Sequence, residues 1–268
     1  MDGLIVFDFD GVICNSIHDS LMTALNSYIE LFPENSLPLT RQLSLEEILK
    51  FEADNSEFYS KFLNLMPFGN FARDYYVILR IIDKHFDGKI NSQEDFDLYK
   101  RTIPEKILDE YQAIFYRKRY EIQSRDTEMW VSILPCFPGI KEAVASLSMR
   151  FALAIATSKD KRSVNLLLAS YGMSRYFKDE DIIDKDFEGS KRDHIIRLHR
   201  SHSVPFGNIH FIDDKVLHLL DTRGLNVNCY LATWGFNTSR EEMIALKNGF
   251  RLLRMEELKE LGKESVKE

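Results

Sequence analysis

Two carboxylates, Asp8 and Asp10, directly follow four apolar residues in the stretch Leu-Ile-Val-Phe-Asp-Phe-Asp-Gly over residues 4–11. Side chains alternate along a strand, so both acids project to one side while Phe9 projects to the other. Acids at the end of a buried strand are costly to desolvate unless a metal ion or hydrogen bonds hold them. The pattern therefore indicates a metal or acid–base site. The alternative is a plain strand that turns at Asp10-Gly11, since both residue types favour turns.

Residues that could hold an anion occur at two later points of the chain. Thr157 and Ser158 follow the apolar run 151–156. A hydroxyl and free backbone N–H groups at such a turn can bind a phosphate, although both residue types are also common helix caps. Lys191 precedes a predicted helix, where a positive charge opposes the helix dipole unless an anion lies nearby. Taken alone, a solvated surface lysine is the simpler interpretation of Lys191.

A second pair of acids, Asp213 and Asp214, ends the apolar run 208–212. An acid-rich turn is the alternative interpretation, but the apolar run enters the pair without a break. In parallel α/β sheets, ligands bind at the carboxyl ends of the strands. All these residues follow strands or precede a helix, so we expect them to meet at one edge of such a sheet.

The elements that would position these residues alternate between strands and helices after residue 136, which predicts an α/β fold with a Rossmann-like parallel-sheet core. We predict strands at 4–7, 151–156, 181–184, 208–213, 228–233 and 250–253, and helices at 140–147, 163–171 and 193–199. The charged tail 256–268 is expected to be a solvated helix or a frayed end.

The segment 17–135 has a different texture, rich in Phe and Tyr and with apolar residues at helical spacing. We predict helices at 17–31, 71–82 and 99–120, the last with a new start near Pro104. We interpret the aromatic residues as core packing between helices. The predicted organisation is an α/β core of residues 1–16 and 136–268, with residues 17–135 inserted as a helical cap domain.

Two charged patterns within the insertion have simpler explanations than a binding site. Residues 83–94 are similar to an EF-hand calcium loop, but His85 stands at the third ligand position and Phe86 follows it. We favour a helix–loop–helix turn capped by Ser92. The basic cluster 117–119 is interpreted as a solvated helix face.

Composition narrows the class of protein. The chain has 268 residues, 44% of them hydrophobic, and a formal charge of -7, which argues against a nucleic-acid or polybasic membrane partner. The three cysteines, Cys14, Cys136 and Cys229, are odd in number and far apart, as expected for reduced thiols. No stretch approaches the ~18 apolar residues of a membrane span, and no secretory signal precedes the first strand. We expect a cytoplasmic protein without a membrane partner.

The order and spacing of these residues resemble the haloacid dehalogenase superfamily, and within it the phosphoglycolate phosphatase-like hydrolases that carry a C1-type helical cap. The family's first motif, DxDG after a hydrophobic strand, matches residues 8–11. Its second motif matches Thr157, its third Lys191, and its fourth, an acidic pair, matches Asp213 and Asp214. The loop 232–235, Ala-Thr-Trp-Gly, is also similar to the loop that follows the fourth motif.

The chain departs from the family pattern at two points. Members with the longer fourth motif carry a second acid four residues after the first, whereas Leu217 and His218 occupy this region here. Asp214 would then have to take the role of this second acid. The insertion 17–135 is also longer than a usual C1 cap, so the resemblance does not predict the residues of the substrate pocket.

The resemblance implies Mg²⁺-dependent transfer of a phosphoryl group to Asp8 as an aspartyl-phosphate. Asp8, the backbone carbonyl of Asp10, and Asp213 or Asp214 would bind the Mg²⁺. Asp10 would protonate the leaving alkoxide and then deprotonate water, and its presence points to phosphate esters. The phosphate would be held by three residues, Thr157, Ser158 and Lys191.

The predicted function is a phosphatase that hydrolyses a small phosphorylated metabolite, such as a phosphorylated sugar, glycolate or nucleotide. Two alternatives stay open: a phosphomutase of the same fold, and a non-catalytic phosphate-binding or regulatory protein. The sequence does not indicate which residues of the insertion select the substrate, nor an oligomeric state.

Overall fold

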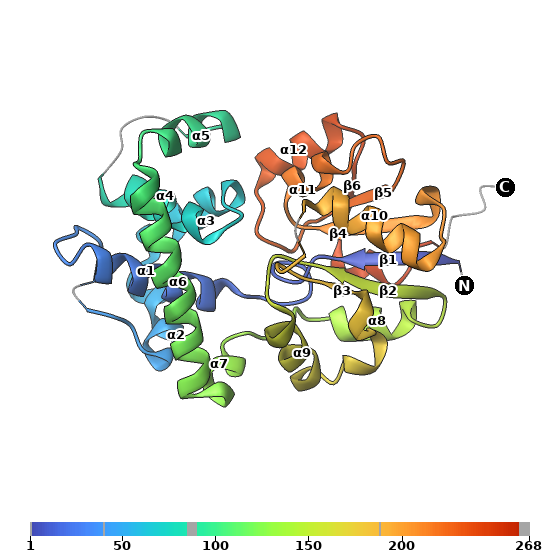
Figure 1. Ribbon diagram of the computed structural model, residues 1–268, viewed down its shortest axis with the longest axis horizontal. Coiled ribbons are helices and arrows are strands. Elements are labelled where there is room, and N and C mark those ends of the chain that lie inside the picture. The colour runs from blue at the N-terminus through green and yellow to red at the C-terminus, as the bar shows by residue number, and fades with distance from the viewer. Residues whose placement is uncertain (1, 40, 85–89, 188, 263–268) are drawn as a thin grey trace. The chain divides into compact units, whose positions relative to one another are not determined.

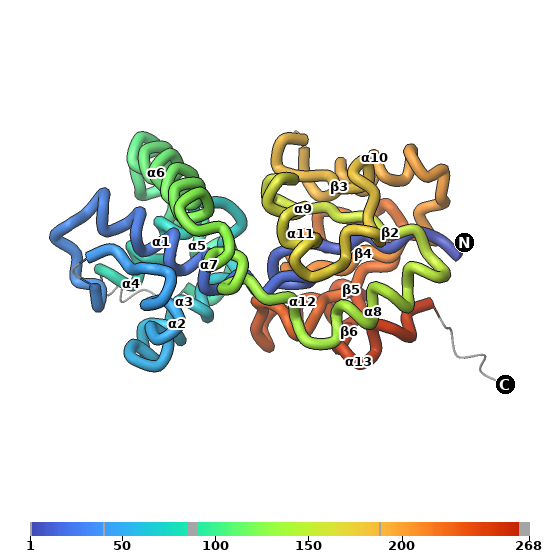
Figure 2. Tube along the Cα trace, turned by 90° about the horizontal axis from the view of Figure 1, so that it is seen from below, coloured from blue at the N-terminus to red at the C-terminus, as the bar shows by residue number. Residues whose placement is uncertain are grey.

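The computed structural model describes residues 2–39, 41–84, 90–187 and 189–262. They divide into two compact units, the first formed by Met1–Asn15 with Pro135–Glu268 and the second by Ser16–Leu134 (Figure 1). The chain passes between the units twice, after β1 and before α8, as the colours of the trace show (Figure 2).

The first unit is built on a six-stranded parallel sheet with the strand order β3-β2-β1-β4-β5-β6. The strands are β1 (Gly3–Phe7), β2 (Phe151–Ala156), β3 (Ile182–Ile183), β4 (Ile209–Asp213), β5 (Asn228–Ala232) and β6 (Arg251–Leu253). Each predicted strand is present, so the α/β fold with a Rossmann-like sheet is confirmed. The chain runs outward from β1 to β3 and then crosses to β4 on the other side of β1. The switch point of the topology therefore lies between β1 and β4.

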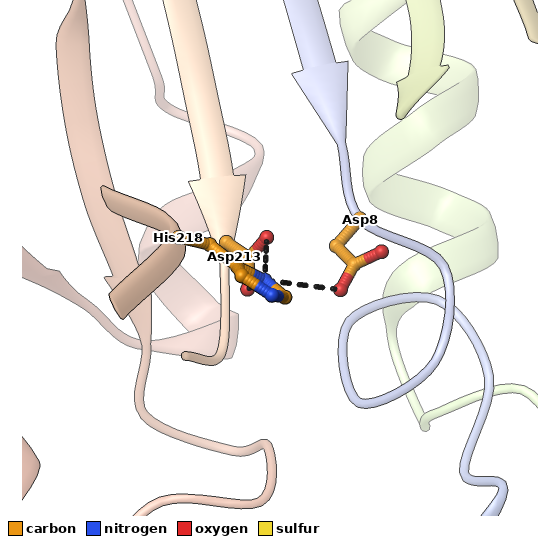
Figure 3. A group of neighbouring side chains, drawn as sticks. All are labelled: Asp8, Asp213 and His218. Atoms are coloured by element: carbon orange, nitrogen blue, oxygen red, sulfur yellow. Dashed lines mark hydrogen bonds and ion pairs between the residues drawn. The ribbon is translucent and has the colours of Figure 1, made fainter. Parts of the chain in front are cut away.

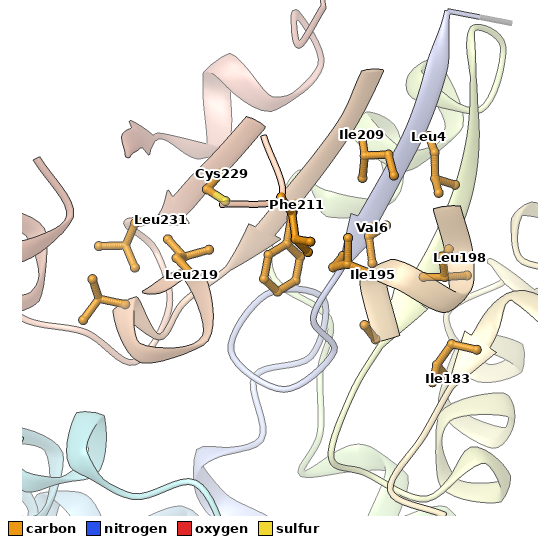
Figure 4. Close-up of a cluster of buried hydrophobic side chains, with 14 of the residues drawn as sticks. Leu4, Val6, Ile183, Ile195, Leu198, Ile209, Phe211, Leu219, Cys229 and Leu231 are labelled. Carbon is orange, nitrogen blue, oxygen red and sulfur yellow. The ribbon is translucent and has the colours of Figure 1, made fainter. Parts of the chain in front are cut away.

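Alternation along the strands gives the sheet two buried faces. Leu4 and Val6 of β1 point to one face of the sheet. There they belong to a cluster of buried side chains that also includes residues of the helices covering this face, such as Ile195 and Leu219 (Figure 4). Ile5 and Phe7 point to the other face and are equally buried. Strands buried on both faces explain why apolar runs, rather than alternating patterns, marked them in the sequence.

The helices of the first unit cover both faces, with α8 and α9 on one side and α10, α11 and α12 on the other (Figure 1). Their bounds are α8 (Ile140–Leu147), α9 (Lys161–Ser170), α10 (Lys191–His202), α11 (Val216–Asp221), α12 (Ser239–Lys247) and α13 (Met255–Leu258). Short 3₁₀ turns lie at Ser174–Tyr176, Asp179–Asp181 and Phe206–Asn208. Helix α10 begins two residues before the predicted start because Ser190 caps it, in a capping box closed by Asp193.

The second unit is entirely helical in the residues described. Its helices are α1 (Ile17–Leu31), α2 (Leu45–Asp54), α3 (Ser56–Leu65), a 3₁₀ turn (Met66–Phe68), α4 (Ala72–Asp83), α5 (Gln93–Arg101), α6 (Glu105–Arg125) and α7 (Thr127–Ser132). The predicted helix 99–120 is two helices, divided where Pro104 lacks the N–H that a continuous helix needs. The aromatic residues pack in the core as predicted, for example Tyr76 against Tyr28 and Tyr111, with ring centroids 5.7 and 5.4 Å apart.

One interpretation within this unit is only partly right. Arg117 is exposed as expected, but Arg119 pairs with the fully buried Asp19 at 2.9 Å and the buried Lys118 pairs with Glu30 at 2.7 Å, so the basic cluster 117–119 is not a solvated face as a whole. Of the EF-hand-like segment, residues 85–89 lie outside the described residues, and Ser92 caps α5 as predicted. Within the described ranges, no helix is both long and apolar enough to cross a membrane.

Candidate active site

The switch point of the sheet brings the first acids of the two pairs together. Val6 and Phe7 of β1 pair with Phe211 and Ile212 of β4, and the Asp8 backbone N–H donates to the Ile212 carbonyl at 2.9 Å. Asp8 therefore lies beside Asp213, each at the carboxyl end of its strand. Figure 3 shows both side chains pointing into the space beyond the strand ends. Both carboxyl groups are buried.

Lys191 joins these two acids. Its ammonium Nζ lies 2.9 Å from Oδ1 of Asp8 and 3.4 Å from Oδ2 of Asp213, and its side chain is buried. Oδ1 of Asp8 also accepts the backbone N–H of Phe9 at 2.8 Å. The solvated interpretation of Lys191 is therefore wrong, and the two oxygens of Asp8 differ: Oδ1 is held by donors, whereas Oδ2 faces His218.

His218 completes this group, and the sequence had given it no role. Its Nδ1 lies 2.9 Å from both oxygens of Asp213 and 4.0 Å from Oδ2 of Asp8 (Figure 3). The ring comes from the first turn of α11, directly after β4. The signal available in the sequence was its place: His218 stands near the position where the resemblance expects a second acid.

Asp214 does not belong to the cluster that Asp8, Asp213 and His218 form. Its Oδ2 accepts the backbone N–H of Phe236 at 2.8 Å, and its carboxyl is enclosed by Gly11 and Gly235. A Cβ on Gly11 would stand 2.2 Å from Asp214 Oδ2, and Gly11 has a φ of +84°, so this turn requires glycine on both counts. Among the described residues, Oδ1 of Asp214 is buried without a hydrogen-bond partner.

Asp10 points to a different cation. The Nζ of Lys159 lies 3.1 and 3.2 Å from its two carboxylate oxygens, and the Lys159 side chain is almost fully buried whereas that of Asp10 is 33% exposed. The two DxD acids therefore pair with different lysines. Asp8 belongs to the buried group with Lys191, and Asp10 is the more accessible acid with a lysine of its own.

The two predicted phosphate-binding hydroxyl residues follow β2 on the same edge of the sheet. Thr157 is buried, and its backbone N–H donates to the Ile183 carbonyl at 2.9 Å. Its hydroxyl accepts the backbone N–H of Lys159 at 3.1 Å. Ser158 is exposed at the tip of the turn. The phosphate-binding roles of both residues stay predictions.

The charges of this region are out of balance. Burial raises the pKa of the Asp8 carboxyl, which Lys191 only partly opposes. Burial also raises the pKa of Asp214, to about 8, with Asp213 adding to the effect. Burial would likewise raise the pKa of Asp213, but His218 and Lys191 outweigh it and hold that pKa at about 2.

A divalent cation would relieve this imbalance, and the donor set fits one. The carboxyl groups of Asp8, Asp213 and Asp214 are buried, and the buried ammonium of Lys191 contacts only the first two. Within the described part of the chain, Asp8, Asp213 and His218 offer ligand atoms that all lie within 4.8 Å of one another. Two carboxylates and an imidazole are ligands that divalent metals accept. The residues present therefore fit a metal site.

The family follows from comparison with known proteins. The family model of the haloacid dehalogenase-like hydrolases matches residues 3–216, which include Asp8, Asp10, Thr157, Lys191 and Asp213. The chain belongs to this family. Its members generally use a divalent metal ion, in agreement with the donor set. No curated protein matches the sequence significantly.

Solved structures of similar fold match this hydrolase over nearly its whole length. A predicted phosphoglycolate phosphatase from Haemophilus somnus is 17% identical, with a TM-score of 0.62 over 96% of each chain. A predicted phosphatase from Clostridium acetobutylicum is 16% identical, with a TM-score of 0.58 over 96% of each chain. A candidate beta-phosphoglucomutase from Thermotoga maritima is 18% identical, with a TM-score of 0.54 over 98% of this chain and all of that one. These similarities show the fold.

Proposed function

We propose that this hydrolase is a phosphatase that cleaves a small phosphate monoester through an aspartyl-phosphate on Asp8. The observation that carries the proposal is the pairing of Asp8 with Lys191 beside Asp213, at the switch point of the sheet. A carboxylate held by a buried ammonium at a ligand-binding edge is placed to attack an anionic substrate. Asp10, two residues further on, is accessible enough to exchange protons with that substrate.

In the first step, one oxygen of the Asp8 carboxylate attacks phosphorus and the bond from phosphorus to the ester oxygen breaks. Asp10, protonated, gives its proton to the departing alkoxide, which leaves as an alcohol. In the second step, Asp10 takes a proton from a water molecule that attacks the same phosphorus. The bond to Asp8 then breaks, which restores the carboxylate and releases inorganic phosphate.

The remaining residues hold charge in place during both steps. Lys191 favours the ionised form of Asp8 and donates to a phosphoryl oxygen, where a positioned donor is worth about 10²–10³ in rate. Thr157, Ser158 and nearby backbone N–H groups would bind the other phosphoryl oxygens. A divalent cation, Mg²⁺ in this proposal, would be held by Asp8, the Asp10 carbonyl and Asp213 or Asp214, and would offset repulsion between carboxylate and phosphate.

The proposal also assigns roles to the parts of the chain. Residues 1–16 and 136–268 form the catalytic core domain, and residues 17–135 form a helical cap domain that selects the leaving group.

All three cysteines, which lie in described residues, are thiols rather than disulfides, which supports a reducing compartment and hence the cytoplasm. The partner is a small phosphorylated metabolite, with no role for nucleic acid or membrane.

A panel of phosphorylated sugars, 2-phosphoglycolate and nucleotides, assayed for phosphate release with Mg²⁺, tests the proposal. Wild type should turn over at least one ester, and D8N should be inactive. Beryllofluoride, which mimics a phosphoryl group on a carboxylate, should raise the melting temperature of wild type only with Mg²⁺ present, and not that of D8N. Equal and negligible turnover of wild type and D8N, without beryllofluoride stabilisation, would instead favour a non-catalytic binding protein.

A phosphomutase is the second candidate. The fold similarity to a candidate beta-phosphoglucomutase and the presence of both Asp8 and Asp10 favour it. Incubation with a hexose monophosphate separates the two functions: phosphate release supports the phosphatase, and formation of the isomer without phosphate release supports the mutase.

A further inference from the structure

We propose that His218 is a direct ligand of the catalytic cation, and that its nitrogen shifts the preference of the site from Mg²⁺ toward transition metals such as Mn²⁺ and Co²⁺. The inference rests on the metal dependence proposed above and refines it. It concerns a residue next to the expected position of the second acid, five residues after Asp213 and four after Asp214, so the donor set of this chain is two carboxylates and one imidazole.

The distances within the group are those of ligands around one ion. Ligand atoms about 2.1 Å from a metal lie about 3 Å apart in adjacent positions and about 4.2 Å apart in opposite ones. His218 Nδ1 lies 2.9 Å from the oxygens of Asp213 and 4.0 Å from Oδ2 of Asp8. The other oxygen of Asp8, Oδ1, already has Lys191 and Phe9 as donors, which leaves Oδ2 for the cation.

The local fold explains how the ring reaches this position. The Lys215 backbone N–H donates to Asp213 Oδ1 at 2.9 Å, which fixes the turn between β4 and α11. His218 is the third residue of α11, and helix side chains lean toward the N-terminus of their helix. The imidazole is thereby directed back to the end of β4 (Figure 3). Ligation would use the lone pair of Nδ1, as in any histidine ligand.

Donor chemistry gives the selectivity. Mg²⁺ prefers oxygen ligands, whereas imidazole suits transition metals. Replacing a carboxylate by a neutral imidazole also removes one negative charge, which weakens the attraction on which Mg²⁺ depends most. Later transition metals bind more tightly than Mn²⁺ at almost any site. A preference for Co²⁺ over Mg²⁺ alone would therefore not identify a His218 ligand. The informative result is how much that preference changes when His218 is replaced.

Pulsed electron paramagnetic resonance of the full chain loaded with Mn²⁺ tests ligation without turnover. The wild-type spectrum should show the ¹⁴N modulation of a coordinated imidazole, and H218N should bind Mn²⁺ without it. H194Q is the matched control, because His194 is the buried histidine on α10 near Lys191 and its removal should leave the modulation intact. A wild-type spectrum without nitrogen coupling, or a coupling that survives in H218N, would overturn the inference.

Calorimetric titration with Co²⁺ and Mg²⁺ tests selectivity. The ratio of the Mg²⁺ to the Co²⁺ dissociation constant should fall at least tenfold in H218D, which restores an all-oxygen set, relative to wild type. An unchanged ratio would contradict the proposed shift. The outcomes also separate the two proposals. If Mn²⁺ binds without nitrogen coupling, only this inference fails. If no divalent cation binds wild type at all, the proposed metal-dependent function fails with it.

Discussion

Helix α10, which carries Lys191 into the active site, also carries a histidine whose protonation should destabilise the fold in mild acid. His194 lies one turn after Lys191 and is 5% exposed, and its ring packs edge-on against Phe187 at 5.4 Å. A backbone group of Phe187 favours the protonated ring, but only in part. Burial, together with the charge of Lys191, lowers the pKa of His194 from 6.5 to about 4.

Whether acid stabilises or destabilises the fold depends on which state, folded or unfolded, binds the proton of His194 more readily. Between pH 6.5 and about 4, the unfolded chain protonates His194 and the folded protein does not, so the free energy of unfolding falls as the pH falls through this window. At 1.36 kcal/mol per pKa unit, the full effect is about 3 kcal/mol, of which about 2 kcal/mol is lost between about pH 7 and pH 5. Below about pH 4 both states are protonated and the contribution does not change further.

Urea unfolding of wild type and H194Q at a series of pH values measures this contribution. Glutamine does not titrate, so the variant should lose about 2 kcal/mol less than wild type between about pH 7 and pH 5. The comparison uses the slope with pH, so a uniform loss of stability from placing Gln in a buried position does not affect it. Parallel pH profiles for the two proteins would refute the low pKa of His194.

Three further substitutions test the assignments in the site. D10N should lose about 10²–10⁴ in kcat, because it removes the proton donor and acceptor, while calorimetry shows cation binding retained; unchanged turnover would contradict the acid–base role. K191A should lose about 10²–10³ in kcat, whereas K161A, whose lysine pairs with Asp179 instead, should stay near wild type; a normal rate for K191A would move the phosphate-binding role elsewhere. G11A should lower the free energy of unfolding in urea by more than the ~1–2 kcal/mol of a left-handed backbone alone, because its Cβ meets Asp214; a smaller loss would show that the carboxyl moves aside.

Local sequence signals predicted most of the sheet and its covering helices. The strand 151–156 and the helices 17–31 and 140–147 have the predicted bounds, since each is marked by a continuous apolar run or a clear helical stripe. Helices α11 and α12 were not predicted, because α11 is only six residues long and α12 presents mixed polar and apolar residues. Capping also moved a boundary, since the Ser190 capping box begins α10 at Lys191.

The sequence predicted which residues belong to the site better than it predicted which of them contact one another. Asp8, Asp10 and Asp213 stand out as acids that follow apolar runs. Which cation each acid meets depends on the strand order, which the sequence does not state. The pairing of Lys159 with Asp10 requires β2 to lie next to β1, and the approach of His218 to Asp8 requires β4 to lie on the other side of β1.

Trapping of the phosphorylated residue tests the central claim, that Asp8 is the nucleophile, most directly. Wild type and D10N are incubated with p-nitrophenyl phosphate and Mg²⁺, quenched in acid and reduced with borohydride, which converts an aspartyl-phosphate into homoserine. Peptide mass spectrometry should find homoserine at position 8 only, with more in D10N, because nitrophenolate leaves without a proton but the second step still needs Asp10. Phosphate release without homoserine at position 8, or homoserine at another aspartate, would contradict the account.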